Sequence, residues 1–356
     1  MHKYYSGLKV FHFGEKLASL TRENPTVRPP LHIRLKPTNF CNHRCSYCAY
    51  RAGNLQLGQD MDQKDAIGKD KMIEIVDDLA ELGVKAVTFS GGGEPFCYPH
   101  LAMTLPRLHD AGIRFASLTN GSLLRGELAE LFAHLGTWLR ISLDGWDDAS
   151  YAAYRGIEVG AFTRLLSNIE HFAKLGGRCA LGVSLIIDER NHAHIHETTG
   201  RLRDLGVTSV KISPCIVSND VEANNAYHER FHDEAWEQAQ KAAADFNGEG
   251  FEVMNLYHKL EGRFNKTYTW CPFLQILTVI GADLNVYSCQ DKAYNLKSGC
   301  LGSIRDTRFK NFWMHGKGKF FDVNPARDCG HHCVANAKNL LLHEFLGLDR
   351  EHLSFV

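Results

Sequence analysis

Three cysteines stand close together in the segment Cys41-Asn-His-Arg-Cys45-Ser-Tyr-Cys48. Their spacing is C-x3-C-x2-C, and an odd number of thiols cannot all pair as disulfides. Thiolates select soft metals and iron–sulfur clusters. A cubane cluster has four irons, so three thiolates leave one iron open, and an open metal position is where chemistry can occur. The alternative is a zinc knuckle or a chance cluster, although His43 is awkwardly placed to complete a closed tetrahedron with its neighbours.

The cysteine spacing, with the aromatic Tyr47 before the last cysteine, resembles the radical S-adenosylmethionine superfamily. The resemblance implies that Cys41, Cys45 and Cys48 hold a 4Fe–4S cluster whose fourth iron binds S-adenosylmethionine. It implies that one electron, from a reductant such as flavodoxin or ferredoxin, passes through the cluster and cleaves the cofactor. The resulting 5′-deoxyadenosyl radical would abstract a hydrogen atom from the substrate.

The elements around this segment alternate between strand and helix patterns. Strands are predicted at 31–36, 84–89, 115–118, 138–143, 180–187 and 209–213, and helices at about 69–82, 99–111, 123–135, 148–175, 192–205 and 224–245. Six such units predict a parallel β/α sheet, and they are fewer than a full eightfold barrel needs. The fold class is therefore α/β, and the resemblance implies a partial (β/α)6 TIM-like barrel, with which the count agrees.

Ligands of such sheets bind at the C-terminal ends of the strands, so the loops there are the ones to search. Gly91-Gly92-Gly93-Glu94-Pro95 follows the second strand, and glycines let the backbone approach a ligand closely. Ordinary strand-end turns would look similar. The resemblance implies a cofactor site made of the following residues: Gly92, Gly93 and Glu94 at the amino group, Ser142 and Asp144 at the ribose, Arg155 at the carboxylate, Tyr47 near the adenine, and Asn120.

A second group of cysteines lies near the end of the chain. Cys271 and Cys289 flank an apolar strand, a Gly-Asp turn and a second strand, which predicts a β-hairpin that brings the two thiols together. Cys329 and Cys333 follow later, so four thiols are available for a second 4Fe–4S cluster or for zinc. The arrangement resembles the Twitch domain, the shortened form of the SPASM extension, and implies an auxiliary 4Fe–4S cluster that accepts an electron or staples a small domain.

The second group departs from the full SPASM pattern because the C-x2-C-x5-C run is absent. One auxiliary cluster is therefore expected, with Cys271, Cys289, Cys329 and Cys333 as ligands. The competing ligands are Cys300, His331 and His332.

Three other cysteines have no metal role by pattern. Cys97 and Cys179 are read as small buried side chains. Cys215 follows the sixth strand at the catalytic end of the barrel. A thiol there could return a hydrogen atom to the opposite face of a carbon radical, which would make the protein an epimerase.

Length and composition bound the remaining possibilities. The chain has 356 residues, 44% of them hydrophobic, and a net charge of −1, which suits one large domain and a small one. We expect an N-terminal arm at 1–30, the barrel at 31–262, and an auxiliary-cluster domain with a C-terminal helix at 263–356. The sequence has no run of five basic residues, which disfavours a nucleic-acid partner. It shows no signal-peptide pattern, which disfavours export. It has no long apolar run, which disfavours a membrane span. Eleven cysteines are then typical of reduced thiols in a cytosol.

These expectations together predict an oxidoreductase or epimerase. The favoured substrate is a small molecule, a sugar or sugar-nucleotide of the kind used in polysaccharide biosynthesis. The second candidate is a peptide- or protein-modifying enzyme, although the 1–30 arm is too short for the leader-peptide domain that precedes many such relatives. From a different class, the chain could be a non-catalytic iron–sulfur electron carrier or a metal-stapled binding protein. The Gly92–Pro95 and Ser142–Gly145 loops disfavour this class, because an electron carrier needs no cofactor cradle.

Overall fold

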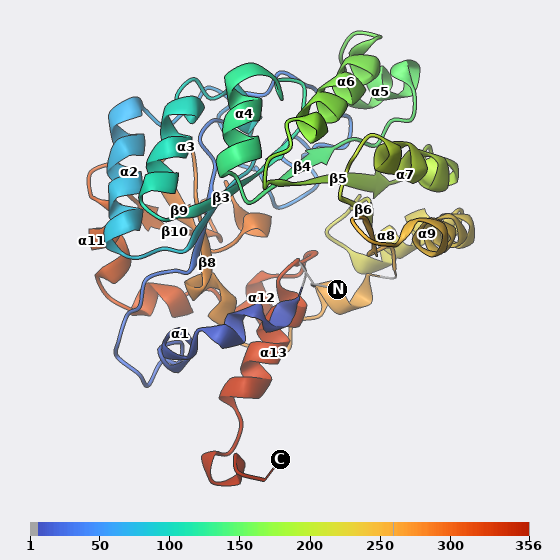
Figure 1. Ribbon diagram of the computed structural model, residues 1–356. Helices are drawn as coiled ribbons and strands as arrows, with labels where there is room; N and C mark the ends of the chain where they lie inside the picture. Colours follow the sequence, from blue (N-terminus) through green and yellow to red (C-terminus); the bar gives the residue numbers. More distant parts are fainter. Residues whose placement is uncertain (1–5, 259, 356) are drawn as a thin grey trace.

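The computed structural model describes residues 6–258 and 260–355. Within them, ten strands form one sheet in the order β10-β9-β8-β1-β2-β3-β4-β5-β6-β7 (Figure 1). The strands are β1 (His32–Leu35), β2 (Ala86–Phe89), β3 (Arg114–Thr119), β4 (Trp138–Ser142), β5 (Ala180–Ile187), β6 (Ser209–Pro214), β7 (Glu252–Asn255), β8 (Leu277–Ile280), β9 (Asn285–Tyr287) and β10 (Cys300–Ser303). From β8 through β1 to β7 every neighbouring pair is parallel.

Helices follow the strands of the barrel, so the predicted β/α alternation is confirmed. The helices are α1 (Gly14–Ala18), α2 (Lys69–Glu81), α3 (Leu101–Asp110), α4 (Gly126–Leu135), α5 (Asp148–Arg155), α6 (Ala161–Lys174), α7 (Ile195–Asp204), α8 (Val221–Glu229), α9 (His232–Phe246), α10 (Glu261–Phe264), α11 (Phe309–Met314), α12 (Pro325–Asp328) and α13 (Asn336–Leu346). Among these helices, none has the length and apolarity needed to cross a membrane.

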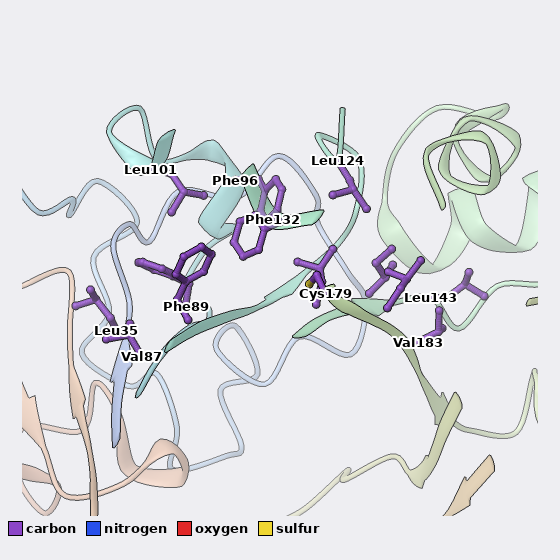
Figure 2. Close-up of a cluster of buried hydrophobic side chains, with 14 of the residues drawn as sticks. Leu35, Val87, Phe89, Phe96, Leu101, Leu124, Phe132, Leu143, Cys179 and Val183 are labelled. Atoms are coloured by element: carbon purple, nitrogen blue, oxygen red, sulfur yellow. The ribbon is translucent and has the colours of Figure 1, made fainter. Parts of the chain in front are cut away.

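The main core lies between the sheet and the helices on its outer face. Alternate strand residues point to it: Ile33, Val87, Phe115 and Leu139 are each at most 1% exposed. Figure 2 shows side chains of this core, where the Phe132 ring of α4 stacks on Phe96. The Phe132 ring also meets the Phe115 ring edge-on. Since strand side chains alternate between faces, burying one set leaves the other on the opposite face.

Two strand assignments differ from expectation. Strand β7 was not among the predicted strands; it lies in the polar region at about 246–269 and extends the parallel sheet beyond β6. Its four residues are too few, among polar neighbours, for a clear alternation. The predicted hairpin forms as β8 and β9, but it continues the barrel sheet because β8 pairs in parallel with β1. The expected boundary between residues 262 and 263 is thus crossed by one sheet.

The N-terminal segment packs on the C-terminal part of the chain. The short 3-10 helix at Gly7–His12 and α1 bury Val10 and Leu17 in a small cluster with Ile276 and Leu342. These two partners belong to the predicted 263–356 domain and not to the predicted barrel. Residues 1–5 of the predicted arm, and residues 259 and 356 of the other two predicted domains, lie outside the described residues.

Candidate functional site

The predicted site loops lie at one edge of the sheet, where β1 to β6 end. The cysteine loop follows β1, the glycine loop follows β2, Asn120 follows β3, Asp144 follows β4 and Cys215 follows β6. Parallel strands place these ends on one side. The sheet therefore gathers residues that are up to 174 positions apart, from 41 to 215, in the sequence.

Helix α5 holds the cysteine loop in place. The backbone N–H groups of Arg44 and Ser46 donate to the carbonyls of Arg155 (2.8 Å) and Tyr154 (3.0 Å). The helix ends at Gly156, whose φ is 59°, a conformation that favours glycine. A Cβ atom at this position would lie 2.8 Å from the Arg44 carbonyl oxygen, so the glycine also permits the loop to approach.

The three thiols of the cysteine loop are half-buried. Burial, with the charges of Glu94 and Cys45, raises the pKa of Cys41 to about 12. Burial also raises the pKa of Cys48, and Cys45 contributes there too. Cys45 thus lies close to both other thiols. Binding metal at these positions requires loss of the thiol protons, which is the usual coupling between metal binding and proton release.

The glycine loop packs directly against the chain that enters the cysteine loop. Gly93 N–H donates to the Thr38 carbonyl at 3.1 Å, and Glu94 N–H donates to the Phe40 carbonyl at 2.8 Å. A Cβ atom at Gly93 would lie 2.0 Å from the Phe40 carbonyl oxygen, which no side chain could tolerate. Gly93 is therefore required for the contact between the two loops.

The Glu94 carboxylate joins the ends of β2 and β3. It is 3% exposed and accepts hydrogen bonds from Thr119 Oγ1 (2.6 Å), Asn120 N–H (2.7 Å) and Phe96 N–H (3.0 Å). Burial raises the pKa of Glu94, and these three donors oppose the rise. Asn120 in turn donates through Nδ2 to Asn42 Oδ1 in the cysteine loop at 2.8 Å.

Asp144 and Arg155 form a buried ion pair beside the cysteine loop. Arg155 Nη2 lies 3.0 Å from Asp144 Oδ2, with both side chains at most 4% exposed. Asp144 has φ of 76°, an unusual value for a residue other than glycine. Its carboxylate also accepts from Tyr47 OH and from Ile186 N–H (2.6 Å). These partners hold a strained strand end in place.

Arg155 has further partners. It donates to the Leu143 carbonyl at 2.8 Å and, through Nη1, to Cys45 Sγ at 3.3 Å. The resemblance had implied that it pairs with the cofactor carboxylate and that Asp144 reaches the ribose. In this structure they pair with each other, while Ser142 is half-buried opposite Ser184 of β5. The cofactor roles of Ser142, Asp144 and Arg155 remain predictions.

Cys215 lies at the same edge as the cysteine loop. Its N–H donates to the Ile187 carbonyl (2.9 Å), and its carbonyl lies 2.8 Å from His228 Nε2. Burial, with the charges of Asp188 and Asp144, raises the pKa of the Cys215 thiol to about 12. Its S–H bond is therefore intact at neutral pH, which a hydrogen-atom donor requires.

The four C-terminal cysteines lie within range of one another's charges, although no three of them are grouped closely enough in the described residues to hold a metal ion. Burial first, and then the charges of Asp291 and of three thiols, those of Cys329, Cys333 and Cys271, raise the pKa of Cys289. In addition to burial, Cys329 also raises the pKa of Cys271, and Cys271 raises the pKa of Cys333. Four thiols are the number of donors that a closed iron–sulfur or zinc site needs, so the ligand set stays a prediction.

The competing ligands Cys300 and His331 have partners other than the four C-terminal thiols. Cys300 is on β10, its Sγ faces the Gly302 carbonyl at 3.6 Å, and burial and Asp283 raise its pKa without a contribution from the four thiols. His331 Nδ1 lies 2.7 Å from the His332 carbonyl. In residues 6–258 and 260–355, no group of three or more histidine, cysteine, aspartate or glutamate side chains is arranged around a single metal ion.

Residues that surround the four thiols were not found from the sequence. Asn339 of α13 donates through Nδ2 to Cys271 Sγ at 3.3 Å. Lys266 and Lys292 are buried nearby and act on the pKa of Cys329, which burial raises and the two cations lower. Cations and N–H donors around sulfur stabilise thiolates. Their spacing along the chain carries no signal of this arrangement.

Lys36 connects the two cysteine groups and was also missed. It is fully buried, and its Nζ donates to Tyr50 OH, the Gly91 carbonyl and Gln290 Oε1. Tyr50 follows Cys48 by two residues, Gly91 begins the glycine loop, and Gln290 follows Cys289. The sequence feature that could have indicated Lys36 is the alternation of apolar and basic residues at 31–36, since it places a cation at the catalytic end of β1.

An open cavity of about 440 Å³ adjoins the cysteine loop. Asn42 and His43 line it together with residues of α5, α6 and the loop after β3. Its size is within the range of small-molecule sites. Asn42, one of its lining residues, accepts a hydrogen bond from Asn120 of the predicted cofactor site.

Comparison with known proteins finds similarity to one superfamily over part of the chain. A profile of the Radical SAM superfamily matches residues 35–202. The chain is 27% identical over 185 residues to an AdoMet-dependent heme synthase of Methanosarcina barkeri, covering 51% of this chain and 50% of the relative. It is 31% identical over 154 residues to a GTP 3′,8-cyclase of Staphylococcus aureus, covering 42% and 44% respectively. The chain thus matches about half the length of these relatives or less.

The overall fold is similar to that of Streptococcus suis SuiB bound to its precursor peptide SuiA. The superposition has a TM-score of 0.62 and covers 95% of this chain and 76% of SuiB, at 13% sequence identity. At that identity the likeness concerns the fold alone.

The separation of Cys300 from the other four C-terminal thiols gives a direct test. We expect anaerobically reconstituted Cys289→Ala to hold about four fewer irons than the wild type, because it loses a ligand of one 4Fe–4S cluster. Cys300→Ala is the matched control and should keep the wild-type iron and sulfide content. Equal losses in the two variants, measured by colorimetric iron and sulfide assays, would contradict the ligand set.

The Lys36 contacts predict a stability effect. We expect Lys36→Met to lower the free energy of unfolding by about 1–3 kcal/mol, because the buried Gly91 carbonyl loses its donor. Lys85→Met changes an exposed lysine at the start of β2 and should stay within about 0.5 kcal/mol. Anaerobic denaturant titrations measure both values, and a Lys36→Met protein as stable as the control would show that the bridge adds nothing.

Proposed function

This chain carries a Radical SAM superfamily domain at residues 35–202, and from that premise we propose that it is an enzyme that abstracts a substrate hydrogen atom to oxidise or epimerise a sugar or sugar-nucleotide. One observation carries the proposal: the cysteine loop, the glycine loop and the Asp144–Arg155 pair meet at one edge of the sheet through direct contacts. A carrier or scaffold protein has no need for that convergence.

The donor chemistry at this edge fits the family's cofactors. Cys41, Cys45 and Cys48 would hold a 4Fe–4S cluster, and their loop is fixed by α5. Glycine loop backbone and the Glu94 carboxylate would receive the amino end of S-adenosylmethionine. Asn39 Oδ1 and His43 Nδ1 are buried at this edge without a protein partner among the described residues, so polar atoms are free to face a ligand. When bound, the cluster and S-adenosylmethionine supply a 5′-deoxyadenosyl radical.

The second group of thiols fits an auxiliary cluster. Cys271, Cys289, Cys329 and Cys333 would be its ligands, with Asn339 orienting Cys271. Lys266 and Lys292 would offset part of the thiolate charge. The Lys36 bridge keeps this group at a fixed position relative to the cysteine loop.

Cys215 is the candidate hydrogen donor of an epimerisation. Its S–H would give a hydrogen atom to a substrate carbon radical, forming a C–H bond and leaving a thiyl radical. An electron from the external reductant and a solvent proton would restore the thiol. We expect Cys215→Ala to convert substrate without inversion or to stop turnover; the wild-type rate with unchanged stereochemistry of the product would exclude this role.

A peptide- or protein-modifying enzyme is the second candidate. It is supported by the likeness of the fold to SuiB, whose structure holds a precursor peptide, and by 28% identity over 182 residues to the subtilosin biosynthesis protein AlbA of Bacillus subtilis. Binding of a short precursor peptide by the reconstituted protein, with no binding of sugar nucleotides, would favour it.

The proposal is tested by cofactor cleavage. We expect the anaerobically reconstituted protein, reduced in the presence of S-adenosylmethionine, to release 5′-deoxyadenosine, because the edge supplies the cluster ligands and the cofactor cradle. Chromatography with mass detection measures the product. The Cys41/Cys45/Cys48→Ala variant should release none and should hold about four irons where the wild type holds about eight.

The absence of cofactor binding and cleavage would contradict the proposal. If the wild type binds metal through the C-terminal cysteines but neither binds S-adenosylmethionine by calorimetry nor cleaves it, the chain is an iron–sulfur carrier or a metal-stapled binding protein.

A further inference from the structure

The cavity of about 440 Å³ beside the cysteine loop is built from parts of the chain that are far apart in sequence. Its wall is formed by Asn42 and His43, by the loop between β3 and α4, by one side of α5 and by the first two turns of α6. Helix α6 contacts both α4 and α5, and Figure 1 shows these helices along the same side of the molecule. Among the described residues that line the cavity, Cys41, Cys45 and Cys48 are absent, so it is separate from the predicted cluster site.

The floor of the cavity carries two polar atoms that lack a protein partner. Tyr151 and His43 are 1% and 4% exposed, so they belong to the deepest part of the lining. The Tyr151 hydroxyl and His43 Nδ1 are buried, and neither forms a hydrogen bond within the part of the chain that the structure describes. The two rings meet edge-on, with their centroids 6.3 Å apart. Because buried polar atoms are normally paired, both atoms indicate a partner that the protein itself does not supply.

The rim of the cavity carries an excess of one positive charge. The charged residues of the lining are Arg125, Glu158 and Arg164, and all three are exposed. Arg164 pairs with Glu158, so those two charges balance. Arg125 forms no ion pair within the described residues; it is the N-cap of α4 and makes no side-chain cap hydrogen bond, and the acid of the first turn, Glu127, does not line the cavity. A guanidinium at the positive end of a helix favours an anion with a single charge.

Other polar groups of the wall already have partners. Asp148 accepts hydrogen bonds from Thr163 N–H (3.1 Å) and Oγ1 (2.6 Å), so the N-terminus of α6 is occupied. Asn168 Nδ2 donates to the carbonyls of Gly121 (3.0 Å) and Ser122 (3.3 Å). These bonds fix the wall of the cavity and leave the contacts with a ligand to the floor atoms and to the rim arginine.

Apolar side chains lie between the floor and the rim. Leu165 of α6 is buried, whereas Leu123 and Ile157 are half-buried, which places them at intermediate depth. Apolar surface in such a cavity favours the apolar body of a ligand, since burial removes both surfaces from water. The volume is within the range of small-molecule sites. A molecule that satisfies the whole lining has one negative charge, an apolar body and a hydrogen-bonding group at its far end.

We propose that this cavity is a ligand site, separate from the cofactor site, for a small organic acid with one carboxylate, an apolar body and a hydroxyl group at the far end. The carboxylate meets Arg125, and the hydroxyl reaches Tyr151 and His43. Because Asn42 and His43 belong to the cysteine loop, the bound acid lies directly against that loop. The inference goes beyond the proposed function and does not depend on the radical reaction.

The test measures binding to the reconstituted protein by calorimetry under anaerobic conditions. The probes are 4-hydroxyphenylacetate, phenylacetate, tyrosol and tyramine, which share an aromatic ring and differ in the charged group or the hydroxyl. We expect 4-hydroxyphenylacetate to bind most tightly, with an affinity that falls as salt rises. Phenylacetate lacks the hydroxyl and tyrosol lacks the charge, so each should bind about three- to tenfold more weakly. Tyramine is a cation and should bind most weakly of the four.

Two variants separate the floor from the rim. Tyr151→Phe removes only the hydroxyl, and because that group has no protein partner the denaturation midpoint should not fall. It should bind 4-hydroxyphenylacetate about three- to tenfold more weakly and phenylacetate as the wild type does. Arg125→Gln should weaken the binding of both acids but not of tyrosol. Arg114→Gln changes an exposed arginine at the start of β3 and is the matched control, with all affinities unchanged. Circular dichroism checks that each variant is folded.

The proposal is overturned if 4-hydroxyphenylacetate gives no heat of binding at millimolar concentration, since water alone then occupies the cavity. Equal affinity of the wild type and Tyr151→Phe for this probe would also overturn it, as would tighter binding of tyramine. Displacement of the probe by excess S-adenosylmethionine would place it in the cofactor site and so contradict a separate site. Release of 5′-deoxyadenosine is assayed independently, so failure of the radical reaction and failure of this proposal are told apart.

Discussion

The arrangement of the two cysteine groups depends on the hydrogen bonds that the side-chain nitrogen of Lys36 donates. An ammonium has three N–H donors, and Lys36 has three acceptors: Tyr50, Gly91 and Gln290. Burial, and then the charge of Arg34, lowers the pKa of Lys36, while Asp291 opposes this. A buried cation is tolerated only when its donors are satisfied, so the three segments must keep their positions. One nitrogen atom, Lys36 Nζ, therefore links the loops of the two cysteine groups.

At the catalytic edge, too, single charged side chains hold several segments in place. Asp144 holds Arg155, Tyr47 and the Ile186 N–H, and Arg155 reaches Cys45. Glu94 does the same for the ends of β2 and β3. Each carboxylate therefore has a structural task in addition to any contact with a ligand. Charged groups fixed before a ligand arrives are what an electrostatically organised site requires.

Much of this architecture could be predicted from the sequence. Strand and helix periods fixed the six β/α units, and residues at strand ends were correctly expected to share one edge. The pairing of Asp144 with Arg155 was not predictable, because it depends on how the strained strand end faces α5. The parallel pairing of β8 with β1 was missed for a similar reason: a hairpin pattern specifies its own two strands but not the outer neighbour of either.

The four C-terminal thiols were predicted from the sequence, since cysteine is rare enough that spacing alone suggested a common site.

The position of β8 has a consequence for the order of folding. Strand β1 ends at residue 35, yet its second neighbour in the sheet begins at residue 277. During synthesis about 240 further residues must be added after β1 before β8 can pair with that side of it. Until then β1 is an open edge, with unpaired N–H and carbonyl groups that can pair with another chain. The nascent protein is therefore most vulnerable to aggregation late in its synthesis, and completion of the C-terminal hairpin is the event that ends that period.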